Sequence, residues 1–265
     1  MAETAQVVES PKAAAHRAEA HPATLREYVE SLLVTVILAL FGTTFVVQAF
    51  KIPSQSMEPT LLVGDHLLVN KFIFGGRGQW YDRILPYREI RRSDIIVFKF
   101  PFQDHPHYVK RVIGVSGDRV KIVDQLVYVN GKRITEPYVV RDPAAPYEPF
   151  GDNFPPRSAE YLQANMQPEW ADQILQYVHD GEIVVPPGKY FAMGDNRDHS
   201  WDSRFWGFVD RDAIMGRPVV IYWSVQGSRD EQADRSLNGW LLSFLDTVLH
   251  LPSRTRWSRM FHEVH

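Results

Sequence analysis

The chain has 265 residues, of which 45% are apolar, and its formal net charge is -3. This length allows one large domain or two modest ones, and the apolar fraction is sufficient for a packed core. A slightly acidic chain gives no reason to expect nucleic-acid binding. The sequence contains no cysteine, which excludes disulfides and thiol catalysis and leaves the redox compartment undetermined.

The amino-terminal part consists of a polar tail and an apolar run. Residues 1–29 are predicted to be a flexible cytoplasmic tail, because most of them show no helical or strand periodicity. In residues 32–50, only three threonines, one glycine and one glutamine interrupt the apolar run. About 20 such residues cross a bilayer as a helix, so we predict a single transmembrane helix over residues 30–50. A cleavable signal peptide is the alternative, but its apolar region spans roughly 7 to 15 residues and precedes a small-residue cleavage site.

The segment after this run, residues 52–61, contains Ser56 between Pro53 and Pro59. The prolines restrict the preceding residues to extended conformations, as a rigid exposed loop requires. A serine hydroxyl is a poor nucleophile unless a base lies within hydrogen-bond reach and donors await the oxyanion. A plain turn whose hydroxyls bond their own backbone is the alternative. The hypothesis that Ser56 is a nucleophile therefore depends on a partner elsewhere in the chain.

The candidate base is Lys110, in the apolar, strand-like residues 108–118. If its side chain points inward, desolvation lowers the pKa of the ammonium group and leaves an amine that accepts the Ser56 proton. Most lysines in strands face water instead. Arg111 points to the opposite face of the strand, so only one of the two side chains is solvated on a given side.

Short strands with turn residues between them predict a mainly β domain. Its β-rich core is expected over residues 51–137 and 181–225, with a hairpin at Asn130-Gly131. Residues 138–180 are rich in proline and lack strand periodicity, so we predict an inserted cap with a helix over residues 169–178, the alternative being a surface loop.

A dense polar run, residues 194–204, follows this cap and lies between apolar residues. Such runs are usually surface loops. Here hydroxyl, carboxylate and guanidinium groups alternate, which is typical of a hydrogen-bonded scaffold beneath a site. We predict that residues 226–265 form a polar linker followed by an amphipathic segment. This segment packs either on the membrane interface or on the protein's own core.

The segments that carry Ser56, Lys110 and the polar run, in this order, resemble the motif boxes of bacterial type I signal peptidases (leader peptidases), which are membrane-bound Ser-Lys endopeptidases. The resemblance includes Gly64-Asp65 and residues 93–99 and covers the chain from about residue 50 to residue 222. It implies a mainly β, signal-peptidase-like coiled β-sheet catalytic domain with an inserted cap region, preceded by a single transmembrane helix.

By motif position, the resemblance implies that Ser56 is the nucleophile and Lys110 the general base. Ser54 and the backbone N–H of Ser56 are implied to form the oxyanion hole, and Ser200 to orient Lys110. The implied ion-pair scaffold consists of Asp195, Asp202, Arg204 and Arg111. The implied shallow apolar pockets are shaped by Phe50, Ile52, Met57, Leu61, Val97, Tyr108 and Val109.

The implied function is removal of signal peptides from secretory preproteins, after small-x-small sequences such as Ala-x-Ala, through an acyl-enzyme. The expected partners are these preproteins and the cell membrane, and no nucleic acid, cofactor or metal is expected. Positive charges before and after the apolar run favour a cytoplasmic amino terminus only slightly. The resemblance implies a single-pass protein of the cytoplasmic (inner) membrane with its catalytic domain on the outer face.

Several alternatives stay open. Self-cleaving repressors of the DNA-damage response share the dyad, but they are soluble and carry a DNA-binding domain. A membrane-tethered β domain that binds exported chains without cutting them has no need of Ser56, Lys110 and Ser200 together. A Ser-His-Asp triad would use His199, where the family commonly has Asn. A metal site is disfavoured because the candidate histidines show no ligand spacing: His66, His105, His107 and His199.

Overall fold

The computed structural model describes residues 25–42, 47–75, 87–100, 107–156, 166–226 and 252–265. The chain divides into two compact units, Met1–Phe41 and Gly42–His265. Residues 1–24 of the predicted tail lie outside the described residues. In the first unit the described element is helix α1, Leu25–Phe41, so the last residues of the predicted tail are helical.

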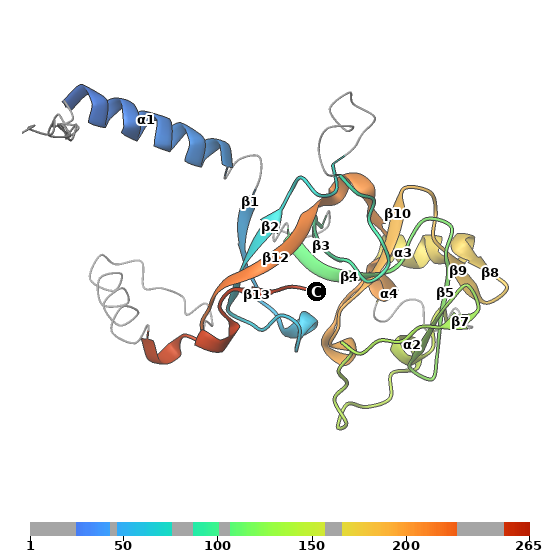
Figure 1. The fold of residues 1–265 in the computed structure, drawn as a ribbon. Coiled ribbons are helices and arrows are strands. Elements are labelled where there is room, and N and C mark those ends of the chain that lie inside the picture. The colour runs from blue at the N-terminus through green and yellow to red at the C-terminus, as the bar shows by residue number, and fades with distance from the viewer. Residues whose placement is uncertain (1–24, 43–46, 76–86, 101–106, 157–165, 227–251) are drawn as a thin grey trace, which may run out of the picture. The chain divides into compact units, whose positions relative to one another are not determined.

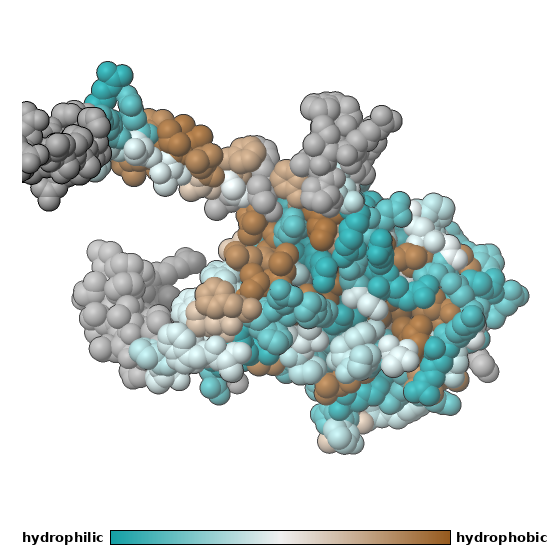
Figure 2. Space-filling model, in the orientation of Figure 1, coloured by the Kyte–Doolittle hydropathy of each residue, from teal (hydrophilic) through white to brown (hydrophobic). Residues whose placement is uncertain are grey.

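Helix α1 has 17 residues and no buried side chain. Apolar residues gather along it, as Figure 2 shows. The helix predicted over residues 30–50 is wrong in extent, because α1 ends at Phe41 and Val47–Lys51 is strand β1. Local apolarity did not reveal that these residues pair with strand β2, Asp65–Asn70. Among the residues described, no helix is both long and apolar enough to span a membrane.

The second unit is mainly β, and its larger sheet has eight strands (Figure 1). The path through this antiparallel sheet is β1-β2-β12-β3-β4-β10-β11, with β13 paired to β12. The bounds of the strands not yet given are Ile95–Lys99 (β3), His107–Gly114 (β4), Lys189–Met193 (β10), Val209–Asp210 (β11), Ile214–Ser224 (β12) and His262–Glu263 (β13).

Strand β12 curls this sheet, because its first residues pair with β3 and the others with β2. Register shifts interrupt the β12 pairings, and such irregularities bend a strand. At Gly216 the strands approach so closely that an added Cβ would lie 2.3 Å from the carbonyl oxygen of Asn70.

A second, five-stranded sheet follows the order β7-β6-β5-β9-β8. Its strands are Arg119–Val123 (β5), Leu126–Val129 (β6), Lys132–Arg133 (β7), Val178–His179 (β8) and Glu182–Val184 (β9). The short helices are Pro149–Asp152 (α2), Pro168–Gln173 (α3) and Ser203–Trp206 (α4), with 3-10 turns at Gln55–Met57 (η2), Ile174–Tyr177 (η5), Arg197–His199 (η6), Arg211–Ala213 (η7) and Trp257–Arg259 (η8).

The predicted cap, residues 138–180, contributes to the core of the second sheet. Phe150, Phe154, Trp170 and Ile174 are buried there against side chains from β5, β6 and β9. The boundary between the two sheets therefore differs from the predicted boundary at residue 138, since β5 to β7 belong with β8 and β9. The predicted helix corresponds to α3 and η5.

The end of the chain packs on the larger sheet. Residues 227–251, which include most of the predicted amphipathic segment, lie outside the described residues. The described remainder contains η8 and β13, and Val264 is buried in the same hydrophobic cluster as Ile52, Met57 and Leu61. The last residues of the chain thus support the segment that carries Ser56.

Candidate active site

Ser56 lies in the loop that joins β1 to β2, residues 52–64, hereafter the Ser56 loop. Two backbone hydrogen bonds close it: the Ile52 N–H donates to the Asp65 carbonyl (2.8 Å), and the Gly64 N–H donates to the Ile52 carbonyl (3.0 Å). Met57 is buried in the core beneath, and Ser56 itself is only 8% exposed. The hydroxyl is therefore held in place by a closed and anchored loop.

The Asp65 carboxylate stabilises the second end of this loop. It accepts hydrogen bonds from the Leu62 N–H (2.8 Å) and the Ser224 hydroxyl (2.6 Å). Arg259 lies 2.6 Å from the same carboxylate and also donates to the Thr60 carbonyl (3.0 Å). Arg259 comes from η8, 194 residues away in sequence, and no local signal in the sequence predicted this contact.

Lys110 reaches Ser56 from the middle of β4, where it pairs with Ile96 of β3. Its Nζ lies 2.7 Å from the Ser56 Oγ, and the residue is 2% exposed. Burial lowers the pKa of Lys110 to about 8, although the nearby Asp202 carboxylate acts to raise it. A substantial fraction of the side chain is then a neutral amine near neutral pH, in contact with a hydroxyl.

Ser54 lies on the open side of the same hydroxyl. Its Oγ is 3.4 Å from the Ser56 Oγ, and the residue is exposed to solvent. The structure thus brings together three predicted site residues, Ser54, Ser56 and Lys110. The Ser56 Oγ lies within hydrogen-bond distance of both other polar atoms.

The polar run packs directly against the Ser56 loop at Gly194. An ideal Cβ on Gly194 would lie 2.3 Å from the Ser200 Oγ and 2.4 Å from the Ser56 carbonyl oxygen. Only glycine permits this approach of two backbones. The Asn196 N–H then donates to the Ser56 carbonyl at 3.2 Å.

Ser200 interacts with Asp202 and not directly with the lysine. Its hydroxyl donates to the Asp202 carboxylate (2.8 Å) and accepts from the Gly194 N–H (3.1 Å). The predicted hydrogen bond from Ser200 to Lys110 is not among the hydrogen bonds of the described residues. The Ser200 hydroxyl instead donates its proton to the fully buried Asp202 carboxylate, a charged and therefore strong acceptor.

Two buried ion pairs hold the polar run in place. Arg204 contacts both Asp202 oxygens, at 2.8 and 2.9 Å, and Arg111 contacts both Asp195 oxygens, at 2.8 and 2.7 Å. The pKa of Asp202 is lowered, because burial, which favours the neutral acid, is outweighed mainly by the charge of Arg204. These bidentate pairs fix planar geometry as well as charge, so they suit a rigid scaffold.

A cleft of about 530 Å³ opens beside Ser56 and Lys110. Five of the predicted pocket residues line it: Phe50, Ile52, Met57, Tyr108 and Val109. Leu61 and Val97, also predicted to shape the pockets, are fully buried in the core beneath. Both belong to apolar segments, whose pattern does not distinguish a cleft wall from the layer below.

Three aromatic residues line this cleft without having been predicted for it: His107, His199 and Trp201. His199 and Trp201 belong to the polar run, and membership in that run was the sequence signal that could have identified them as cleft residues. His199 has its Nε2 at 3.7 Å from the Asp142 carboxylate, and both side chains are partly exposed. Its described ion pair thus lies away from the Ser56 hydroxyl. Within the described residues, no group of three or more acidic or histidine side chains could hold a metal ion.

The chain is similar to several known proteins. The family described as "Signal peptidase, peptidase S26" matches residues 25–223. A signal peptidase I of Pseudomonas fluorescens is 35% identical over 217 residues, with 76% of this chain and 73% of the relative covered. A signal peptidase I of Aquifex aeolicus (strain VF5) is 35% identical over 228 residues, with 76% and 85% covered. A crystal structure of a signal peptidase I from Enterococcus faecalis V583 is 30% identical and covers 49% of this chain and 97% of its own, with a TM-score of 0.35.

The family match extends over most of the chain and includes the Ser56 loop, β4 and the polar run. The structure brings these three segments, far apart in sequence, to one cleft. The chain therefore belongs to the signal peptidase family, peptidase S26, and is a serine peptidase.

Proposed function

We propose that this protein is a membrane-anchored signal peptidase I that removes signal peptides from secretory preproteins through a Ser56–Lys110 dyad. One observation carries the proposal: the 2.7 Å contact between the Lys110 Nζ and the Ser56 Oγ, with both residues buried. A buried lysine with a lowered pKa is able to act as a general base for a serine.

In the first half-reaction, neutral Lys110 accepts the Ser56 proton while the hydroxyl oxygen attacks the scissile carbonyl carbon. The resulting lysine ammonium then protonates the leaving amine as the peptide bond breaks. The Ser54 hydroxyl and the Ser56 N–H stabilise the oxyanion, a role supported by the position of Ser54 on the open side of Ser56.

In the second half-reaction, Lys110 removes a proton from a water molecule that attacks the ester carbonyl. The proton then returns from the lysine to Ser56 as the ester bond breaks. The fixed negative charge of Asp202, held by Arg204 and Ser200, opposes the effect of burial on the Lys110 pKa. Through this charge, Ser200 acts on the base indirectly.

The substrate is proposed to bind as an extended chain between two strand edges. Strand β1 has one partner strand, β2, among the described residues, so its other edge is open. On β4, residues 107–110 pair with β3, whereas pairing with β10 begins at Arg111, so within the described part of the chain this half of β4 also has an open edge. Main-chain hydrogen bonds to such edges tolerate varied sequences, and side-chain pockets supply the selectivity. The apolar side chains that line the cleft suit small residues before the scissile bond.

Helix α1 is proposed to anchor the protein in the cytoplasmic membrane. Support comes from its apolar composition and from the absence of any buried side chain on it. The catalytic domain is proposed to lie on the outer face. The apolar segment of the substrate lies in the same bilayer. A membrane anchor on the enzyme therefore raises the effective concentration of the scissile bond at the active site.

The test compares cleavage of a purified preprotein by the full-length, detergent-solubilised protein and three variants: Ser56→Ala, Lys110→Ala and His199→Ala. We expect the first two to lose cleavage while they stay folded, and the third to retain it. An active Lys110→Ala variant, or a folded but inactive His199→Ala variant, would assign the base elsewhere. If the wild type cuts no preprotein but binds it, the protein is a binding module.

A further inference from the structure

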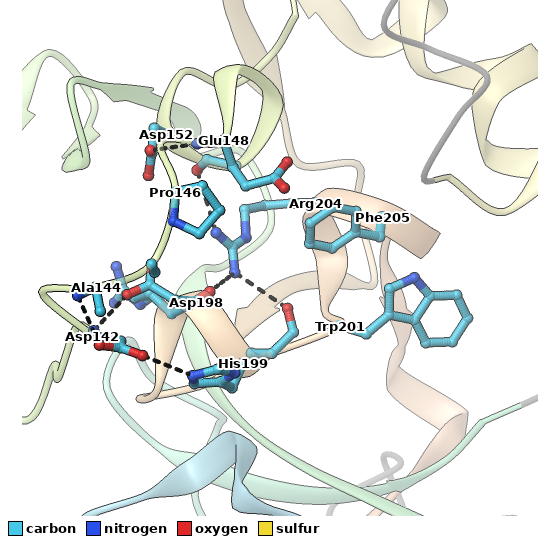
Figure 3. Close-up of a pocket in the computed structure, with 14 residues that line it drawn as sticks. Asp142, Ala144, Pro146, Glu148, Asp152, Asp198, His199, Trp201, Arg204 and Phe205 are labelled. Atoms are coloured by element: carbon cyan, nitrogen blue, oxygen red, sulfur yellow. Dashed lines mark hydrogen bonds and ion pairs between the residues drawn. The ribbon is translucent and has the colours of Figure 1, made fainter.

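A second cleft, of about 700 Å³, is drawn in Figure 3, and it shares lining residues with the active-site cleft. His199 and Trp201 line both clefts, so the two form neighbouring spaces separated by this part of the polar run. From there the second cleft extends to the segment that contains Asp142, Pro146 and Glu148. A polypeptide that passes Ser56 in an extended form therefore has a continuous path from one cleft to the other.

The deeper charges of the second cleft are already paired. Arg204 binds Asp202, as described above. Arg141 contacts Asp152 at 3.2 Å and Asp198 at 3.0 Å. Arg197 forms an ion pair with Glu136. None of these groups offers an uncompensated charge to a ligand.

The rim carries the uncompensated charge, and it is negative. Glu148 is exposed and has no ion pair among the described residues. Asp142 is also exposed, and the Nε2 of the exposed His199 lies 3.7 Å from its carboxylate. Trp201, Phe205 and Pro146 add apolar surface to the same cleft (Figure 3). Such a cleft suits an extended peptide that carries a basic side chain.

The position of the base indicates which half of the substrate enters this cleft. The acyl half of the substrate occupies the open edges of β1 and β4, in the proposed mechanism. The leaving amine receives its proton from Lys110, whose charged neighbours Asp202, Arg204 and Asp195 all belong to the polar run or its helix α4. Because His199 and Trp201, on the same polar run, line both clefts, the second cleft is the space next to the leaving amine that the following residues of the substrate can enter.

We infer that the second cleft binds the preprotein residues that follow the scissile bond, and that Asp142 and Glu148 make it favour basic over acidic side chains there. This inference rests on the proposed function, because it assigns a subsite to the same reaction. It names a specificity determinant outside the cleft that holds the dyad.

The test uses two preprotein substrates with the same sequence up to the scissile bond. Among the third to fifth residues after that bond, one substrate carries two lysines and the other carries two glutamates. Exposed charge pairs change affinity by roughly two- to fivefold each, so we expect kcat/KM to favour the lysine substrate by several-fold. The Glu148→Lys and Asp142→Lys variants are each expected to reduce or reverse this ratio. Raising the salt concentration should weaken the preference, because both carboxylates are exposed.

Asp180→Lys is the matched control. Asp180 is an exposed acidic residue that lines neither cleft, and its substitution makes the same change in net charge. This variant should keep the wild-type ratio, and circular dichroism melting curves should show that all three variants fold. A further substrate pair carries the same charges before the scissile bond, where the variants should not alter the ratio.

Three results would overturn the inference. The first is an equal rate for the lysine and glutamate substrates with the wild type. The second is a ratio that Asp180→Lys changes as much as Glu148→Lys does. The third is a charge preference confined to positions before the scissile bond. Each of these leaves cleavage intact, whereas failure of the proposed function appears as no cleavage of any substrate.

Discussion

The lowered pKa of Lys110 makes a quantitative prediction for the pH dependence of cleavage. With a pKa of about 8, roughly a tenth of the lysine is neutral at pH 7, half at pH 8 and nine tenths at pH 9. Because only the neutral amine accepts the Ser56 proton, kcat/KM should rise about tenfold per pH unit below pH 7 and level off near pH 9. The measurement is initial-rate cleavage of one preprotein across this range, since kcat/KM reports groups of the free enzyme.

The same pKa predicts how folding stability depends on pH. In the unfolded chain Lys110 binds its proton with the ordinary pKa of 10.5, and the drop to about 8 corresponds to roughly 3 kcal/mol. This penalty is fully present below pH 8, shrinks between pH 8 and 10.5, and is absent above. Lys110→Met should therefore gain stability relative to wild type at pH 7, by up to roughly 3 kcal/mol, and lose the gain as pH approaches 10.5. Urea unfolding at pH 7 and pH 10 measures both proteins.

Two outcomes would refute this reasoning. One is a pH-rate profile whose inflection lies near 6.5 and disappears in His199→Ala, because it would identify a histidine base. The other is a difference in stability between Lys110→Met and wild type that stays constant from pH 7 to pH 10. That result would mean that the buried lysine keeps its ordinary pKa.

Three further predictions concern the support of the site. Arg259→Ala should lower kcat and reduce stability by about 1–3 kcal/mol, because the buried Asp65 carboxylate at the end of the Ser56 loop loses its cation at 2.6 Å and keeps only Arg256, at 3.9 Å. Arg92→Ala, which removes an ion pair near the second sheet, should lower the melting temperature and leave kcat unchanged. Gly194→Ala should reduce kcat at least tenfold in steady-state assays, because its Cβ would push against the Ser56 carbonyl, and wild-type kinetics would contradict the close approach. Leu61→Ala should lower the free energy of unfolding, measured with urea, by about 2–5 kcal/mol, because Leu61 is fully buried. The preference for small substrate residues should stay unchanged, and a changed preference would mean that Leu61 lines the cleft.

Part of the site could be predicted from local sequence patterns. A lysine inside an apolar strand and a serine between two prolines are unusual in their immediate surroundings, and both are readable without knowledge of the fold. The same holds for the alternation of strands and turns, which predicted a mainly β protein. Family membership, predicted from three short segments, is confirmed by the match over residues 25–223.

Other features could not be predicted, because they depend on partners far away in the sequence. In the sequence, the apolar residues of β1 resemble the end of a membrane helix. Only the fold shows that they form a strand, because their backbone pairs with β2. Likewise, β5 to β7 form one sheet with β8 and β9, and aromatic side chains of the predicted cap complete the core of that sheet.

The sequence by itself determined the candidate chemistry and the β-rich class of the domain: a candidate nucleophile, a candidate base and the charged groups of the polar run. The tertiary structure alone decided which carboxylate receives the Ser200 hydroxyl, and it brought Arg259 to the Asp65 carboxylate across 194 residues. The physical reason is that propensity and periodicity act over a few neighbouring residues. Ion pairs, burial and cleft walls form between residues that only the packing of the sheets brings together.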